Sequence, residues 1–134
     1  MTFDISSLSA KDQTTVQLRH PVTDELLFAD GDTKKKPVQI TVYGPGSSTY
    51  RNAIAAMQNR QLKRNKKVMT AEMLREEATE LLVTCSVGAD NFDYKGTPLT
   101  TKQAWTDLYN DSALAWVREQ VEANQGDLAN FLQS

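Results

Sequence analysis

Two residue types that often serve in covalent and acid–base catalysis each occur once in this chain, as His20 and Cys85. A nucleophile needs a neighbouring base to activate it. His20 follows Val16 and Leu18 in an alternating stretch, which predicts a strand end beside a turn rather than a general base. Cys85 lies on a helical apolar stripe, where cysteine packs as a small hydrophobic residue. We therefore expect no catalytic residue.

Metal and cofactor sites are not expected either. One histidine and one cysteine are too few for a zinc site, which needs several ligands at suitable spacings. Asp30-Gly31-Asp32 is too short for a calcium loop. Asp90 and Asp93 fit a solvated loop better than a cation site.

The segment most like part of an enzyme is Gly44-Pro45-Gly46-Ser47-Ser48, between a predicted strand and a predicted helix. Backbone amides at a helix start can hold a phosphate. A phosphate-binding P-loop ends in Gly-Lys-Ser/Thr, whereas this segment continues with Thr49-Tyr50-Arg51. The favoured interpretation is a glycine turn with Ser47 or Ser48 as helix cap, and phosphate binding is the alternative.

Positive charge is concentrated in the middle of the chain. Residues 33–71 contain no Asp or Glu and nine basic residues, whereas residues 1–32 have a net charge of −4 and residues 72–134 of −7. The total of −2 therefore hides a strong separation of charge. Such separation bears on association and partner choice, so it favours an interaction protein and allows self-association.

A basic run closes the first predicted helix, just after its apolar stripe ends. The run consists of Arg60, Lys63, Arg64, Lys66 and Lys67, and the stripe of Tyr50, Ala53, Ile54 and Met57. We expect the run to bind a protein partner. One alternative is nucleic-acid binding by helix 51–67, although no aromatic residue follows Arg51 there to stack on bases. The other is a solvated helix end whose cations face the helix dipole and Glu72 or Glu76.

The periodic segments predict an α+β fold, with a small N-terminal antiparallel sheet of about three strands and then three to four helices. Strands at 16–20 and 26–29 should form a hairpin, and a third strand should cover 38–43. The sequence predicts a flexible arm at residues 1–12 and a single domain at residues 13–134. No apolar run approaches the roughly 20 residues of a membrane span, and the N-terminus lacks a secretion signal, so we expect a cytoplasmic protein.

Two features define the second predicted helix. Thr70 should cap it and Gly88 should stop it. Its apolar stripe, which we expect to be buried, is Ala71, Leu74, Ala78, Leu81, Leu82 and Cys85, and its polar face is Glu72, Glu76, Glu77 and Glu80.

The last third of the chain predicts a loop and then further helices. Thr100 or Thr101 should open a short helix, and Asp111 or Ser112 the last one. The last stripe begins Leu114, Val117, Val121 and resumes after Gly126, which predicts either one helix with a weak point or two short helices.

Over nearly its full length the chain resembles the tail assembly chaperones of long-tailed (siphovirus-type) bacteriophages. The order and spacing of several segments carry the resemblance. They are Tyr43-Gly44-Pro45-Gly46-Ser47-Ser48-Thr49-Tyr50-Arg51, Arg60-Gln61-Leu62-Lys63-Arg64-Asn65-Lys66-Lys67, Thr70-Ala71-Glu72, Val87-Gly88, Trp116-Val117-Arg118-Glu119-Gln120-Val121 and Gly126-Asp127-Leu128-Ala129-Asn130-Phe131-Leu132.

The resemblance implies a non-enzymatic role in the cytoplasm of an infected bacterial host. Such proteins bind the helical tape measure protein, keep it soluble, help to recruit tail tube subunits, and are absent from the mature virion. Many exist in a short form and a longer, frameshifted form, and this chain resembles a short form. The family supplies no catalytic residue, cofactor or metal to transfer.

The basic run gives a first prediction. Reversing Lys63, Arg64 and Lys67 to Glu should leave the fold intact and weaken capture of the tape measure protein in a pull-down from co-expressing cells. Nucleic acid should bind only weakly and at low salt. Tight nucleic-acid binding at physiological salt, abolished by the same reversals while tape measure capture persists, would favour the alternative.

Overall fold

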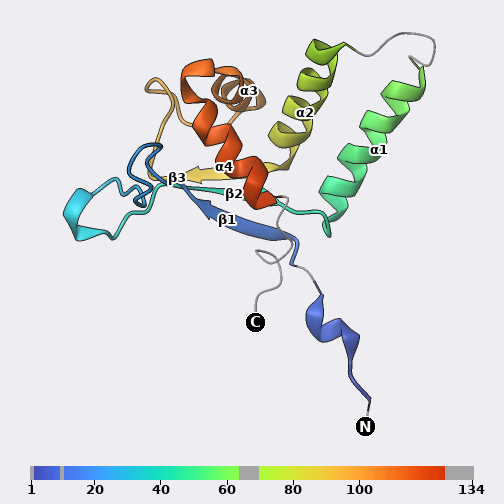
Figure 1. Ribbon diagram of the computed structural model, residues 1–134, viewed down its shortest axis with the longest axis horizontal. Helices are drawn as coiled ribbons and strands as arrows, with labels where there is room; N and C mark the ends of the chain where they lie inside the picture. The colour runs from blue at the N-terminus through green and yellow to red at the C-terminus, as the bar shows by residue number, and fades with distance from the viewer. Residues whose placement is uncertain (1, 10, 64–69, 126–134) are drawn as a thin grey trace.

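The computed structural model describes residues 2–9, 11–63 and 70–125, and this part of the chain has the α+β fold that the sequence predicts (Figure 1). Its antiparallel sheet has the order β1-β2-β3, formed by β1 (Gln13–Gln17), β2 (Gln39–Tyr43) and β3 (Ser86–Asp90). Its α-helices are α1 (Ser48–Lys63), α2 (Ala71–Cys85), α3 (Lys102–Asn110) and α4 (Ala115–Gln125). Short 3₁₀ turns cover η1 (Ile5–Leu8), η2 (Gly31–Thr33) and η3 (Ser112–Leu114).

The predicted hairpin after β1 forms, but residues 26–29 are not a regular strand. Leu26 and Phe28 make only isolated bridges, to Arg19 and Pro37. Leu27 donates its amide to the Leu18 carbonyl at 3.0 Å and accepts from the Val38 amide at 2.9 Å. The segment therefore bonds two neighbours in succession, and it is too short to build a ladder with either. As a result β1 pairs directly with β2, Val16 opposite Ile40.

The third strand comes from a place where the sequence predicted a helix stop. Helix α2 ends at Cys85, and the next residue already begins β3, which places Gly88 opposite Thr41. A register shift between Thr41 and Val42 marks a bulge in this pairing. The sheet is therefore not wholly N-terminal, because α1 and α2 are inserted between its second and third strands.

The core lies between one face of the sheet and the helices above it (Figure 1). Alternation along β1 and β2 turns Val16, Ile40 and Val42 inward, where each is at most 1% exposed. Helices α3 and α4 supply the opposite wall of the core, which is formed by Ala104, Trp105, Leu108, Tyr109, Val117 and Val121. The other face of the sheet is polar, and there the Thr15 and Thr41 hydroxyls lie 3.3 Å apart.

Helices α1 and α2 form an antiparallel hairpin that projects from this body (Figure 1). Helix α1 has no fully buried residue, and its predicted stripe of Tyr50, Ala53, Ile54 and Met57 is half-buried against α2. The stripe predicted for α2 is buried only at its end, at Leu82 and Cys85. Ala71 and Ala78 are exposed, Leu81 is half-buried, and Leu74 is 52% exposed, so the prediction of a fully buried stripe was wrong.

The helix caps lie at positions that the sequence predicted. Ser47 accepts from the Tyr50 amide at the start of α1, Thr70 from the Met73 amide, and Thr101 from the Ala104 amide. Asp111 caps the turn that leads into α4.

The last apolar stripe predicted either one helix with a weak point at Gly126 or two short helices. This alternative concerns residues outside the described part of the chain. No helix in the described ranges combines the length and apolar character that a membrane crossing needs.

The distribution of burial along α2 gives a stability prediction. Leu82 is 2% exposed within the core cluster, so Leu82→Ala should lower the free energy of unfolding by about 2–5 kcal/mol. Leu74→Ala removes the same atoms from a half-exposed position and should cost much less. Urea unfolding of both variants measures the difference. Equal losses would show that the buried face of α2 has been misplaced.

Candidate partner-binding surface

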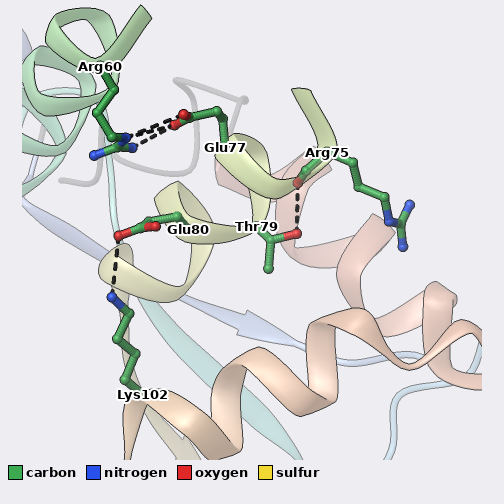
Figure 2. A network of polar contacts seen from close by, with 6 residues as sticks. All are labelled: Arg60, Arg75, Glu77, Thr79, Glu80 and Lys102. Carbon is green, nitrogen blue, oxygen red and sulfur yellow. Dashed lines mark hydrogen bonds and ion pairs between the residues drawn. The ribbon is translucent and has the colours of Figure 1, made fainter. Parts of the chain in front are cut away.

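The basic end of α1 is anchored to α2 by an ion pair between Arg60 and Glu77 (Figure 2). Arg60 Nη2 lies 2.6 Å from Glu77 Oε2, and Arg60 Nε lies 3.3 and 3.2 Å from the two carboxylate oxygens. Two guanidinium nitrogens thus donate to one carboxylate, a geometry that fixes direction as well as distance. This pair ties the last turn of α1 to the middle of α2.

The two partners differ in burial. The side chain of Glu77 is 7% exposed, whereas that of Arg60 is 36% exposed. The hydrogen bonds to Glu77 raise the pKa of Arg60 above its ordinary value. A carboxylate removed from water needs such a partner to stay charged. The primary role of Arg60 in the free protein is therefore to hold the hairpin together.

The other residues of the basic run divide into two groups. Lys63 is exposed at the end of α1, where it can meet a partner. Arg64, Lys66 and Lys67 lie outside the described residues. Glu72 and Glu76, which the solvated-end alternative placed beside the basic run, line the side of α2 that faces α3. Within the described residues, Arg60 of the run pairs with Glu77, which the sequence had assigned only to the polar face of α2.

Exposed leucines stand near the outer end of the hairpin. Leu62 is 70% exposed near the end of α1, and Leu74 is 52% exposed near the start of α2. The sequence gave one sign that Leu62 is exposed, because Leu62 is the last large apolar residue before Lys67 and lies beyond the apolar stripe. It gave no such sign for Leu74, because the apolar stripe of the second predicted helix placed Leu74 in the core.

Two shallow grooves run along the joint between α1 and α2. One, of about 360 Å³, is lined by Ala53, Met57, Arg60 and Leu81 among others. The other, of about 210 Å³, lies between the hairpin and the end of α4, with Tyr50, Ala78, Leu81 and Glu122 in its lining. Both offer apolar atoms with a charged side chain at the margin, which suits an amphipathic segment of a partner.

A third, more polar cleft of about 420 Å³ separates α2 from α3. Across it Lys102 Nζ lies 3.3 Å from Glu80 Oε1, and both side chains are largely exposed (Figure 2). Arg75 extends away from the other labelled side chains, while its carbonyl accepts from the Thr79 hydroxyl at 2.9 Å. The mixed charge at this cleft matches a solvated surface between two helices.

Three residues that the sequence offered for chemistry, Ser47, His20 and Cys85, have structural roles. The Ser47 hydroxyl donates to the Gly44 carbonyl at 2.8 Å besides capping α1. His20 is exposed, and its Nδ1 accepts from the amides of Val22 and Thr23 in the predicted turn. Cys85 is fully buried, and burial raises the pKa of its thiol. In the described ranges no group of three or more His, Cys, Asp or Glu could hold a metal ion.

Comparisons with known proteins add no relative to these observations. No protein-family model, no curated protein and no solved structure matches this chain.

The ion pair gives a prediction that separates a structural role from a binding role. Arg60→Leu should lower the free energy of unfolding by about 1–3 kcal/mol, because it removes two guanidinium donors from the buried carboxylate of Glu77. Replacing both residues by Leu should recover most of that loss. Thermal unfolding of Arg60→Leu, Glu77→Leu and the double variant measures this.

Lys102→Ala is the matched control, because it removes the largely exposed pair with Glu80 and should leave stability nearly unchanged. A loss in the double Leu variant equal to the sum of the single losses would show that Arg60 and Glu77 are not coupled.

Proposed function

We propose that this protein is a bacteriophage tail assembly chaperone that binds its partner on the α1–α2 hairpin. In this proposal it holds the helical tape measure protein in soluble form in the cytoplasm of the infected host. It also helps to recruit tail tube subunits and leaves before the virion is complete.

One observation supports this proposal most directly: α1 has no fully buried residue and packs mainly against α2. A helix of this length gains most of its stability from tertiary packing of one face. That packing is incomplete here, because no residue of α1 is fully buried and the side chains of Leu62 and Leu74 are exposed to water. A partner helix laid along the hairpin would cover them and complete the packing of α1.

The charge of the hairpin indicates the chemistry of that partner. Helix α1 carries Arg51, Arg60 and Lys63 and no acidic residue. Helix α2 carries four glutamates and a single arginine. The hairpin would suit a partner helix with an apolar stripe. Acidic side chains of that helix would face α1, and basic side chains would face α2. According to the family resemblance, the tape measure protein is a long helical partner that must be kept soluble before assembly.

Substitution of the exposed leucines tests the proposal. Leu62→Glu combined with Leu74→Glu should abolish co-purification with the tape measure protein of the same genome. It should leave the thermal midpoint nearly unchanged, because both side chains are exposed in the free protein. The measurement is a pull-down from co-expressing cells, paired with thermal unfolding of the purified variant.

Val22→Glu is the matched control, because Val22 is an apolar side chain that is 85% exposed in the turn after β1. It should capture the tape measure protein as well as the unchanged chain does. Capture unaffected by the leucine substitutions, or failure of the unchanged chain to capture the tape measure protein at all, contradicts the proposal. Tight binding of RNA or DNA by the hairpin at physiological salt would replace it with the nucleic-acid alternative.

A further inference from the structure

The outer edge of β1 is an open strand edge in the described part of the chain. Strand β1 pairs with β2 on one side only, and the sheet order ends at β1. An unpaired strand edge carries a row of backbone donors and acceptors that can pair with another chain. This edge belongs to neither the hairpin nor the helical core.

The hydrogen bonds that flank β1 fix the direction in which its backbone amides and carbonyls point. The Asp12 carbonyl accepts from the Gly44 amide, and the Leu18 amide donates to the Val38 carbonyl. Backbone groups of an antiparallel strand alternate in direction, so the even-numbered residues of β1 face β2. Gln13, Thr15 and Gln17 therefore point their amides and carbonyls outward.

The same edge is capped immediately after β1. The side-chain amide of Gln120, on α4, accepts from the Arg19 amide at 2.8 Å and donates to the Arg19 carbonyl at 2.9 Å. This one side chain satisfies both outward backbone groups of Arg19 as a neighbouring strand would. Beyond Arg19, a cavity of about 320 Å³ lies beside Thr15 and Gln17, and Gln120 and Asn124 of α4 line its other side.

The opposite edge of the sheet is protected differently. Strand β3 is irregular where it pairs with β2, because of the register shift at Thr41 and Val42. The segment containing Leu99 and Thr101 lies close to it, across a small cavity lined by Ser86 and Val87. Bulges and covering loops are the usual devices that prevent strand pairing. Strand β1 has neither a bulge nor a proline nor a charged residue within its five residues.

We propose that a second copy of this chain pairs with β1, strand against strand, about a two-fold axis at Thr15. In this register Thr15 faces Thr15 of the second copy, and Gln13 faces Gln17. All these residues have exposed side chains, and the pairing brings no like charges together. The two sheets then continue as one across the interface.

The symmetry of the segment favours a second copy over an unrelated strand. A two-fold interface requires a patch that complements itself. The sequence Gln-Thr-Thr-Val-Gln places an amide side chain at both ends and a threonine at the centre of the outward set. Glutamine amides can donate and accept at once, so Gln13 and Gln17 match each other in either direction.

A cysteine at the proposed axis tests the contact directly. Paired residues of this type have Cα atoms about 5.5 Å apart, which is a suitable spacing for a disulfide. Thr15→Cys should form a covalent dimer on mild oxidation. Thr41→Cys, on the same open face but one strand further in, should not. Cys85 does not interfere, because it is fully buried.

Charge at the axis provides a second test, read by light scattering on the purified full chain. Thr15→Lys and Thr15→Glu should each weaken self-association several-fold, because like charges then face each other. An equimolar mixture of the two variants should associate again. Thr41→Lys is the matched control, because it also removes the Thr15–Thr41 contact but leaves the edge uncharged.

A wild-type chain that stays monomeric at high concentration overturns the proposal, as does equal cross-linking at Thr41 and Thr15. Dimers that persist unchanged in both charge variants would place the interface elsewhere. None of these outcomes depends on tape measure binding, so this proposal and the proposed function fail separately.

Discussion

The arrangement of the helices depends on one buried guanidinium. Arg118 lies on α4, and its side chain is 9% exposed. Its Nη1 donates to the Thr79 hydroxyl on α2 at 2.7 Å and to the Tyr109 carbonyl on α3 at 3.4 Å, while its Nε donates to Glu122 at 2.6 Å. Because a buried arginine must satisfy its donors, the three helices can adopt few other arrangements. The Tyr109 hydroxyl extends the network to β3 through Ser86, at 2.7 Å.

This constraint explains why the outer part of α2 is exposed. Thr79 must face Arg118, so it is 5% exposed on the inner side of the helix. Residues five apart on an α-helix point about 140° away from each other, which turns Leu74 from the core when Thr79 is buried. Leu82 and Val83 share the inner side with Thr79, whereas Ala78 does not. The polar contact that orders the helices thereby leaves an apolar face toward α1 and solvent.

Features set by local chemistry could be predicted from the sequence, and features set by distant pairs could not. Alternation predicted the burial of Val16, Ile40 and Val42. Hydroxyl capping predicted Thr70 and limited the α3 cap to Thr100 or Thr101, of which Thr101 makes the contact. Both signals act within a few residues.

The errors have non-local causes. Strand β3 was missed because Ser86-Val87-Gly88-Ala89-Asp90 has little β-propensity and is a strand only through its pairing with β2. The buried side of α2 was misassigned because Thr79 owes its burial to Arg118, 39 residues away. For the candidate surface, the sequence placed Arg60 and Lys63 at the basic end of the first helix, but the pairing of Arg60 with Glu77 depends on how the hairpin closes.

Topology keeps the two proposed surfaces apart. The hairpin connects β2 to β3, and β1 forms the opposite edge of the sheet, so pairing through β1 would not cover α1 or α2 (Figure 1). A dimer joined at β1 would therefore present two hairpins at once. A long helical partner with several apolar stretches could bind both, and the second contact would form at the high effective concentration set by the first. Two hairpins that each bind weakly would then suffice to hold a long partner, because one contact can open while the other keeps the partner bound.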